Sequence, residues 1–400
     1  MTTHRLGSSL RCRPPEHTLA KATALMAGLG ISRVTDITRM DRLGLPVYAS
    51  IRPRGRALHV HAGKGLVPLD AQVGALMEAV EFAVAEPARS DWTAQPMAVG
   101  RFLAQFGGHI DLVDFAPILG RKVTLDDVLV TVACADVRSG EPVQLPAELV
   151  FMPFDDPLDL FGWSSNGLAS GNSVDEATLH GLLEVVERDT LSMHKARDGS
   201  RWVVPASLPP PFDRLVDDWR RLGVDTAVRW LPNPFGVHCF HAVLHEPGRL
   251  SVHLAAGYGA HPEPGIALSR ALCEAAQSRL SHVHGGRDDV VRFYERYETD
   301  ALRDEKDAAL LPRLFEHSQP LDYRELSGID TTEPIARQLD RMLDALAAAG
   351  FGQVFRHRFA VDLGGLAVVK VVVPGCEDAE NCPWRMGRRL FASVTGAAWP

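Results

Sequence analysis

The feature that most constrains this chain is a recurrence in which two strand-like runs are followed by a long helix. It appears over residues 46–86, 128–195 and 238–281. In each helix the apolar residues recur at a spacing of three and four. Strands that alternate with helices, with several hairpins among them, predict a mixed α/β (α+β) architecture of sheets packed with helices. Each of the three helices also carries acidic residues near its middle.

The length of the chain allows two or three structural units, which can still form one inseparable domain. It has 400 residues, of which 46% are hydrophobic, so it can bury a large core. The sequence predicts an N-terminal helical segment (1–45), a principal domain with up to three α/β sub-units (46–380) and a C-terminal tail (381–400).

Turn residues and periodicity place the individual elements. Pro15 can start a capped helix over 14–29. The charged region 287–336 predicts short surface helices. Other expected helices are 67–86, 174–195, 212–222, 264–281 and 334–349, and expected strands include 122–125 (KVTL), 128–137, 148–154 (ELVFMPF), 355–363 and 366–374.

The composition argues against several classes of protein. The net charge is −8 and the 42 basic residues are scattered, which is unlike a general nucleic-acid binder. Six cysteines with no C-x-x-C pattern do not form a disulfide scaffold or a zinc site. The N-terminus lacks the apolar region of a secretion signal, and no apolar run could span a bilayer. We therefore expect a cytoplasmic protein with no membrane or nucleic-acid partner.

The helix expected at 174–195 places several acids on one side. Glu184 lies about 80° and Glu187 about 20° around the helix from Glu176 at 100° per residue, with His180 between them. Asn172 and Ser173 precede this helix in SNGLASGNS. Ser173 and Glu176 match a capping box, which explains Glu176 but neither Glu184 nor Glu187.

The other two helices carry acidic or amide pairs at a spacing of three residues. They are Glu78 with Glu81 in ALMEAVE, and Glu274 with Gln277 in ALCEAAQ, where neighbouring alanines leave room for something to approach. Any one such pair is more often surface decoration, because glutamate is a good helix former. The repetition, with apolar flanks rather than lysine or arginine, favours neutralisation by cations. Oxygen ligands of this kind suit Mg²⁺ and phosphate.

A phosphate cradle of the Walker type is absent. Lys64 stands in HAGKGL, but the sequence has no G-x-x-x-x-G-K-[ST]. The SNGLASGNS loop could instead hold an anion at the start of its helix.

Most histidines and cysteines have ordinary interpretations. We expect His180 to pair with Glu176 or Glu184. The remaining candidates lack the spacing of a metal site. We expect them to be strand, core, spectator or capping positions, although Arg287 could also reach a phosphate. They are His59, His61, His238, Cys239, His241, Cys273, Cys376, Cys382, Arg287, Asp288 and Asp289.

Taken as a set, these motifs resemble the YcaO family. The matching pieces are GKGL…ALMEAVE, SNGLASGN…EATLHGLLEVVERD and GYGAHPEPGIALSRALCEAAQSRL, over roughly residues 46–290, with VKVVVPG as a late strand. The resemblance implies a fold that binds ATP through helix carboxylates and Mg²⁺ instead of a P-loop.

Carried over by position, the resemblance implies six metal-binding carboxylates and five further ATP contacts. The carboxylates are Glu78, Glu81, Glu176, Glu184, Glu187 and Glu274. The other contacts are Lys64, Asn172, Arg188, Gln277 and an N-terminal arginine, Arg13 or its neighbour Arg11.

The chemistry implied by the resemblance is activation of a peptide backbone amide by O-phosphorylation. The segment PPEHTL…GISRVTDITRMDRLGLPVYASIRP looks most like members that form thioamides with a TfuA-like partner, acting on ribosomal peptides or proteins. The family also suggests a homodimer. An azoline-forming cyclodehydratase and an amidine-forming enzyme stay open. So do two other classes, a nucleotide-binding accessory protein without amide chemistry and a carboxylate-rich metal hydrolase.

Overall fold

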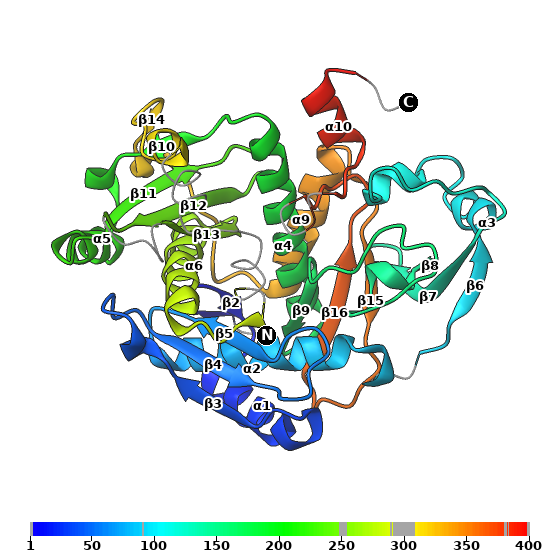
Figure 1. Ribbon diagram of the computed structural model, residues 1–400, viewed down its shortest axis with the longest axis horizontal. Helices are drawn as coiled ribbons and strands as arrows, with labels where there is room; N and C mark the ends of the chain where they lie inside the picture. Colours follow the sequence, from blue (N-terminus) through cyan, green and yellow to red (C-terminus); the bar gives the residue numbers. More distant parts are fainter. Residues whose placement is uncertain are drawn as a thin grey trace.

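The computed structural model of the protein describes residues 3–89, 92–247, 254–288, 290, 309–379, 382 and 384–397. Three helix-covered sheets surround a centre where three long helices approach one another (Figure 1). The prediction of a mixed α/β fold is confirmed. None of the helices in these ranges is long and apolar enough to cross a membrane. Asp289, and most of the region 287–336 in which short surface helices were predicted, lie outside the described residues.

The first unit is built from the N-terminal part of the chain (blue in Figure 1). Its antiparallel sheet has the order β3-β4-β5, and α1 packs on α2. The N-terminal hairpin β1–β2 precedes it. The elements are β1 (His4–Arg5), β2 (Leu10–Arg11), α1 (Pro15–Leu29), β3 (Arg33–Asp36), β4 (Val47–Ile51), β5 (Val60–Lys64) and α2 (Pro68–Ala85).

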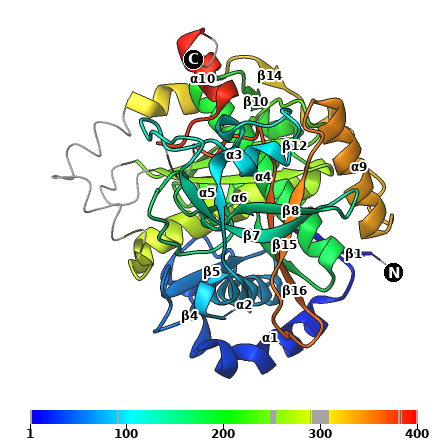
Figure 2. The same ribbon diagram turned by 90° about the vertical axis from the view of Figure 1, so that its right-hand side faces the viewer.

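The second unit contains the long helix with the acidic side. Its sheet has the order β6-β7-β15-β16-β9, with β8 paired to β7. The strands β7, β8, β15 and β16 are labelled in Figure 2. The elements are β6 (Gln95–Ala98), α3 (Val99–Ala104), β7 (Val128–Asp136), β8 (Pro142–Pro146), β9 (Leu168–Gly171), α4 (Val174–Ala196), α9 (Ile335–Ala348), β15 (Phe355–Arg358), β16 (Ala367–Val372) and α10 (Arg388–Thr395).

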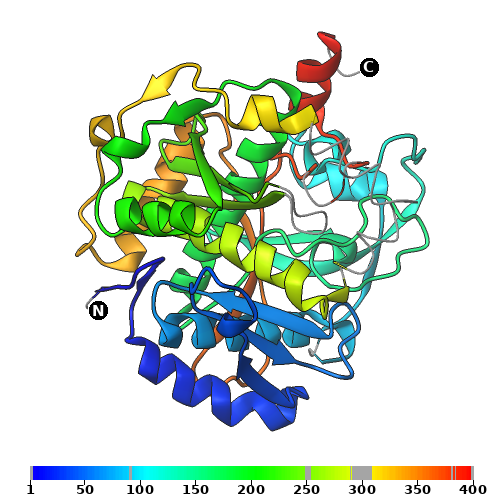
Figure 3. The same ribbon diagram turned by 60° about the vertical axis from the view of Figure 1, so that its left-hand side comes forward.

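The third unit has the sheet order β13-β12-β11-β10-β14, and its helix α6 packs against β13 and β12. In Figure 3, α6 (yellow-green) runs between this sheet and the blue three-stranded sheet. The elements are β10 (Arg201–Val203), α5 (Phe212–Arg221), β11 (Asp225–Trp230), β12 (His238–His245), β13 (Leu254–His261), α6 (Pro264–His284) and β14 (Pro320–Leu321).

The recurrence of strand pair and helix is present as β4–β5–α2, β16–β9–α4 and β12–β13–α6. In the second unit, however, the partner of β9 is β16, which comes from the C-terminal part of the chain and not from the preceding run. The three units also contact one another in a cycle, because α2 contacts β9, α4 contacts β13 and α6 contacts β5. The three acidic helices therefore meet at the centre of the molecule.

Two expected strands are wrong. Residues 122–125 form no strand, and a turn in which the side chain of Asp127 accepts hydrogen bonds from Thr124 leads into β7 instead. Residues 148–154 are a short 3₁₀ turn followed by irregular chain, whose Phe151 and Met152 fill the core. A short apolar run has no periodicity that separates a strand from a buried irregular segment.

Glycines in the strands let the sheet backbone approach the helices closely. A Cβ atom on Gly63 of β5 would lie 2.1 Å from the carbonyl oxygen of Ala71, and one on Gly257 of β13 would lie 2.0 Å from the backbone nitrogen of Ala275. The alanines predicted to leave room on α6 therefore lie against the neighbouring strand β13, which can approach closely because it has a glycine at this position.

Candidate active site

All eleven residues predicted to bind a cofactor line one cavity of about 840 Å³ where the three long helices meet. Its size suits a ligand as large as a nucleotide, since small-molecule pockets span about 300–1,000 Å³. Helix α2 contributes Glu78 and Glu81, α4 contributes Glu184 and Glu187, and α6 contributes Glu274. The cyclic packing of the three units therefore brings together acids that are far apart in the sequence.

The two acids Glu184 and Glu187 on α4 have different surroundings. Glu187 is buried, and its Oε2 accepts a hydrogen bond from the backbone N–H of Ala260 on β13 (2.8 Å). Arg188 places its Nη2 atom 3.6 Å from the Oε1 atom of Glu187. Burial raises the pKa of Glu184 to about 7, against the opposing charge of Arg188. A cation in the cavity would favour the ionised form of this carboxyl.

The acids of α2 are also held in place by backbone and side-chain donors. The N–H of Ala62 donates to Oε2 of Glu78 (2.9 Å), and the hydroxyl of Ser170 donates to Oε1 of Glu81 (2.5 Å). Burial raises the pKa of Glu81 to about 8, although the Ser170 hydrogen bond opposes the shift. Glu81 is therefore mostly protonated at neutral pH in the absence of a ligand.

Helix α6 supplies a carboxylate that already has a cationic partner. Nζ of Lys64 lies 2.7 Å from Oε2 of Glu274. Burial would raise the pKa of Glu274, but the charges of Lys64 and Arg188 outweigh it and hold that pKa below its usual value. Gln277 is 8% exposed, and its Oε1 atom has no hydrogen-bond partner among the described residues. This oxygen is available to a ligand.

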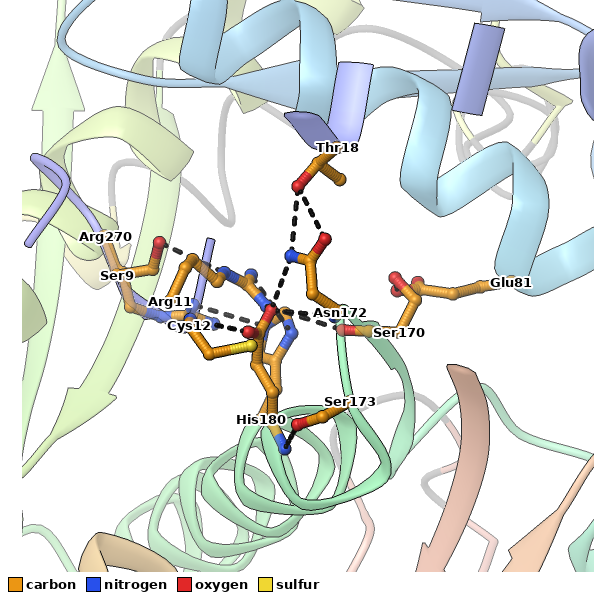
Figure 4. Close-up of polar contacts among 11 residues, drawn as sticks. Ser9, Arg11, Cys12, Thr18, Glu81, Ser170, Asn172, Ser173, His180 and Arg270 are labelled. Carbon is orange, nitrogen blue, oxygen red and sulfur yellow. Dashed lines mark hydrogen bonds and ion pairs between the residues drawn. The ribbon is translucent and has the colours of Figure 1, made fainter. Parts of the chain in front are cut away.

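Glu176 anchors the N-terminal segment, and its partners Arg11, Cys12 and Asn172 are labelled in Figure 4. It accepts hydrogen bonds from the N–H of Cys12 (2.8 Å) and from Nδ2 of Asn172 (3.2 Å), and Nη1 of Arg11 lies 3.3 Å from its Oε1. Burial opposes ionisation, but the charge of Arg11 and these hydrogen bonds lower the pKa of Glu176. The capping box is half formed, because Ser173 accepts from the N–H of Glu176 while the carboxylate turns to other donors.

The pairing expected for His180 is not what the structure shows. Its ring nitrogens lie 3.4 Å from Nη2 of Arg11 and 3.4 Å from Nη1 of Arg270, and neither nitrogen has a described bond to a glutamate (Figure 4). Burial, with the charges of the two arginines, lowers the pKa of His180 and keeps the ring neutral. Arg11 makes the contacts to the acidic helix, whereas Arg13 lines the cavity as an exposed side chain.

Sequence reasoning missed Arg270 and Ser170, which both line the cavity. Arg270 precedes Glu274 by four residues and Gln277 by seven on α6, so its helical spacing was a usable signal. Ser170 offered none, since its role depends on β9 lying against α2.

The other histidine and cysteine candidates do not form a metal centre. Among the described residues, no three His, Cys, Asp or Glu side chains converge on a point suited to a metal ion. His59 pairs with Asp288, His238 contacts the carbonyl oxygen of Ser327, and His241 stacks on Tyr258. The remaining ones in the core are His61, Cys239 and Cys273, while Arg287 and Cys382 line the large cavity.

The donor set of the cavity fits Mg²⁺ bound together with a polyphosphate. Such ions take one or two carboxylates and complete their shell with phosphate oxygens and water, so a pre-formed cluster of three protein ligands is not required. The cavity combines glutamates on three helices with the cations Lys64, Arg188 and Arg270. Two of the acids, Glu81 and Glu184, have raised pKa values that a divalent cation would reverse.

Comparison with known proteins decides the family. The profile described as "YcaO cyclodehydratase, ATP- and Mg²⁺-binding" matches residues 62–377, most of the chain. The chain belongs to the YcaO family. The prediction of ATP and Mg²⁺ as cofactors is confirmed by this assignment.

Relatives and solved structures agree with the assignment. A protein of Methanothermobacter thermautotrophicus is 33% identical over 95% of this chain and 98% of its own length. A protein encoded in the tfuA 3′ region of Rhizobium leguminosarum bv. trifolii is 32% identical over 97% and 93%. The structure of YcaO from Methanopyrus kandleri, bound with AMPPCP and Mg²⁺, is 26% identical, covers 97% of this chain and 98% of its own, and has a TM-score of 0.78.

Proposed function

We propose that this protein uses Mg²⁺–ATP to activate a backbone amide of a peptide or protein substrate, most specifically to form a thioamide. The observation that carries the proposal is the single cavity in which three helices place their glutamates beside Lys64 and Arg188. Membership of a cyclodehydratase family supports amide chemistry. The relative from the tfuA 3′ region supports a sulfur-delivery partner of the TfuA type.

When bound, Mg²⁺–ATP supplies a phosphoryl group that turns the amide oxygen from a poor leaving group into a good one. The residues of the chain itself bind Mg²⁺–ATP and orient it toward the substrate amide. The metal-binding role falls to the predicted glutamates other than Glu176, and burial raises the pKa of two of them, Glu184 and Glu81. Lys64 and Arg188 would stabilise negative charge on the phosphates. Glu176, already saturated by donors, would act mainly by holding the N-terminal segment against the site.

The nucleophile decides the product. Sulfide gives a thioamide, a neighbouring Cys, Ser or Thr side chain gives an azoline, and an amine gives an amidine. The family description as a cyclodehydratase favours the azoline as second candidate. We also propose that the protein acts in the cytoplasm as a homodimer, as the family resemblance suggests.

The test uses purified protein, Mg²⁺, ATP, sulfide and a peptide encoded beside the gene, with mass spectrometry of the peptide. A mass gain equal to the difference between sulfur and oxygen is expected for the thioamide, and loss of one water would instead support the azoline. ATP hydrolysis that ignores the peptide would support the accessory-protein class. Turnover of a substrate without ATP would support the metal hydrolase.

A further inference from the structure

One wall of the cavity is apolar and continuous with the core. Five cavity-lining residues belong to the same hydrophobic cluster, namely Ala57, Met77, Phe82, Met152 and Leu168. Met77 and Phe82 lie on α2 together with Glu78 and Glu81, while the other cavity-lining glutamates lie on α4 and α6. The cavity therefore offers apolar surface in addition to the charged groups that suit a polyphosphate.

Trp163 also lines the cavity and is 39% exposed, so it lies where the cavity meets the surface. Two more large apolar side chains lie on the neighbouring segments, Leu119 (47% exposed) and Trp384 (69% exposed). We call Leu119, Trp163 and Trp384 the apolar strip.

Backbone contacts place the three segments of the strip beside one another. The N–H of Leu119 donates to the carbonyl oxygen of Trp384 (2.8 Å), and Ile118 pairs with Arg385. The N–H of Ile118 donates to the carbonyl oxygen of Leu160 (2.8 Å), three residues before Trp163. The C-terminal segment (red) lies beside the cyan segment in Figure 1. Cys382, two residues before Trp384, also lines the cavity.

We propose that the apolar strip binds a segment of the substrate peptide with large apolar side chains, adjacent to the amide that is modified. This inference rests on the proposed function. A backbone amide can react inside the cavity only if the residues flanking it cross the cavity edge. Trp163 of the strip and Cys382 beside it line the cavity, and tryptophan is among the side chains that most often dominate the binding of a partner chain.

The competing occupants make different demands. A purine ring would use the apolar residues inside the cavity, whereas Trp384 is not among the residues that line it. A second copy of the chain would make the strip part of a dimer interface. Only a peptide that enters the cavity connects the exposed strip with the buried wall.

The test measures binding of two labelled peptides of equal length by fluorescence anisotropy, one with Leu, Phe and Val around a central glycine and one with Ser and Asn there. Trp163→Ser and Trp384→Ser are compared with Leu222→Ser, an exposed apolar position on another part of the surface (38% exposed). We expect the wild type to prefer the apolar peptide and each tryptophan variant to weaken that binding about tenfold, with Leu222→Ser unchanged.

Controls separate this inference from the proposed function. Mg²⁺–AMPPCP affinity and oligomeric state are measured on the same proteins. Equal binding of both peptides, or unchanged binding by the tryptophan variants, overturns the inference. So does a loss confined to AMPPCP affinity, which assigns the wall to the purine, or a change in oligomeric state, which assigns the strip to a second copy. A wild type that binds no Mg²⁺–AMPPCP overturns the proposed function instead, whatever the peptides do.

Discussion

Two carboxyl groups in the same cavity, Glu81 and Glu274, differ in charge because of their neighbours. Burial raises the pKa of Glu81 to about 8, and the nearby charges of Glu184 and Glu78 act in the same direction. The pKa of Glu274 lies below its usual value because Lys64 and Arg188 outweigh burial. Without a ligand, burial thus favours the protonated form of Glu81, whereas Glu274 is ionised in its pair with Lys64.

A pH dependence of stability follows from the raised pKa of Glu81. A carboxyl whose pKa is raised from 4.5 to about 8 by folding costs nothing below pH 4.5, and its penalty grows as the pH rises to about 8. We expect the ligand-free protein to lose about 3–5 kcal/mol of unfolding free energy from this group over that interval. Urea titrations at several pH values measure it. Glu81→Gln should flatten the slope, and an unchanged slope would refute the assignment.

Residue spacing predicted which acids share one face of a helix but not what each one contacts. Helical geometry was sufficient to group Glu184 and Glu187, because both lie on the same helix. The partners of Glu176 and His180 come from the N-terminal hairpin and from α6. Contacts between segments so distant in sequence leave no local pattern, so the pairing of His180 with a glutamate was a wrong expectation.

At the scale of elements, close packing of strand on helix holds each unit together. The long helix predicted over 174–195 is observed as Val174–Ala196, since Ser173 caps its start and periodicity fixes its length. The run 148–154 was misjudged because its apolar residues are buried without strand pairing. Periodic elements were therefore predictable, whereas short apolar runs were not.

Substitution of a strand glycine tests the close packing. In Gly257→Ala the new methyl would lie 2.0 Å from the Ala275 nitrogen, inside van der Waals contact. We expect a loss of about 1–3 kcal/mol in unfolding free energy, or more.

Gly28→Ala is the matched control. It has nothing within 4 Å of the added Cβ and lies in α1, so helix propensity predicts a gain of about 0.5–1 kcal/mol. Denaturant unfolding compares the two variants with wild type. A neutral Gly257→Ala would contradict the packing account.

At the scale of the molecule, a buried ion network joins the first and third units. Arg279 of α6 contacts Asp41 (2.9 Å) and Glu246 (2.6 Å), and all three side chains are nearly inaccessible. The network fixes α6, which carries Glu274, relative to the segment that follows β3. It also shows why the whole arrangement was not predictable, since nothing in the sequence links Asp41, Glu246 and Arg279 to one another.

Removing the central cation tests the network. Arg279→Met leaves the buried carboxylates of Asp41 and Glu246 without the guanidinium between them. We expect a loss of about 3–5 kcal/mol in unfolding free energy. Arg220→Met, which breaks an exposed pair with Asp217, should change it by less than about 1 kcal/mol. Thermal and denaturant unfolding measure both. Equal losses of unfolding free energy in the two variants would show that the buried network stabilises the protein no more than an exposed ion pair does.

The assembly of the site depends on the cyclic contact of three units, one of which takes its strand β16 from the end of the chain. The recurrence in the sequence indicated three similar units but not this closure. The family resemblance, and not residue spacing, predicted that the acids of the three helices share one site. All eleven residues predicted in this way line the cavity.

The most direct test of the central claim is calorimetric titration of the protein with AMPPCP and Mg²⁺. We expect the wild type to bind, and Glu184→Gln to weaken binding at least about a hundredfold. Little stability should be lost, because burial already raises the pKa of Glu184 to about 7. Asp175→Asn, an exposed change on the same helix, should bind like wild type. Full affinity in Glu184→Gln would contradict the claim that this cavity holds Mg²⁺–ATP.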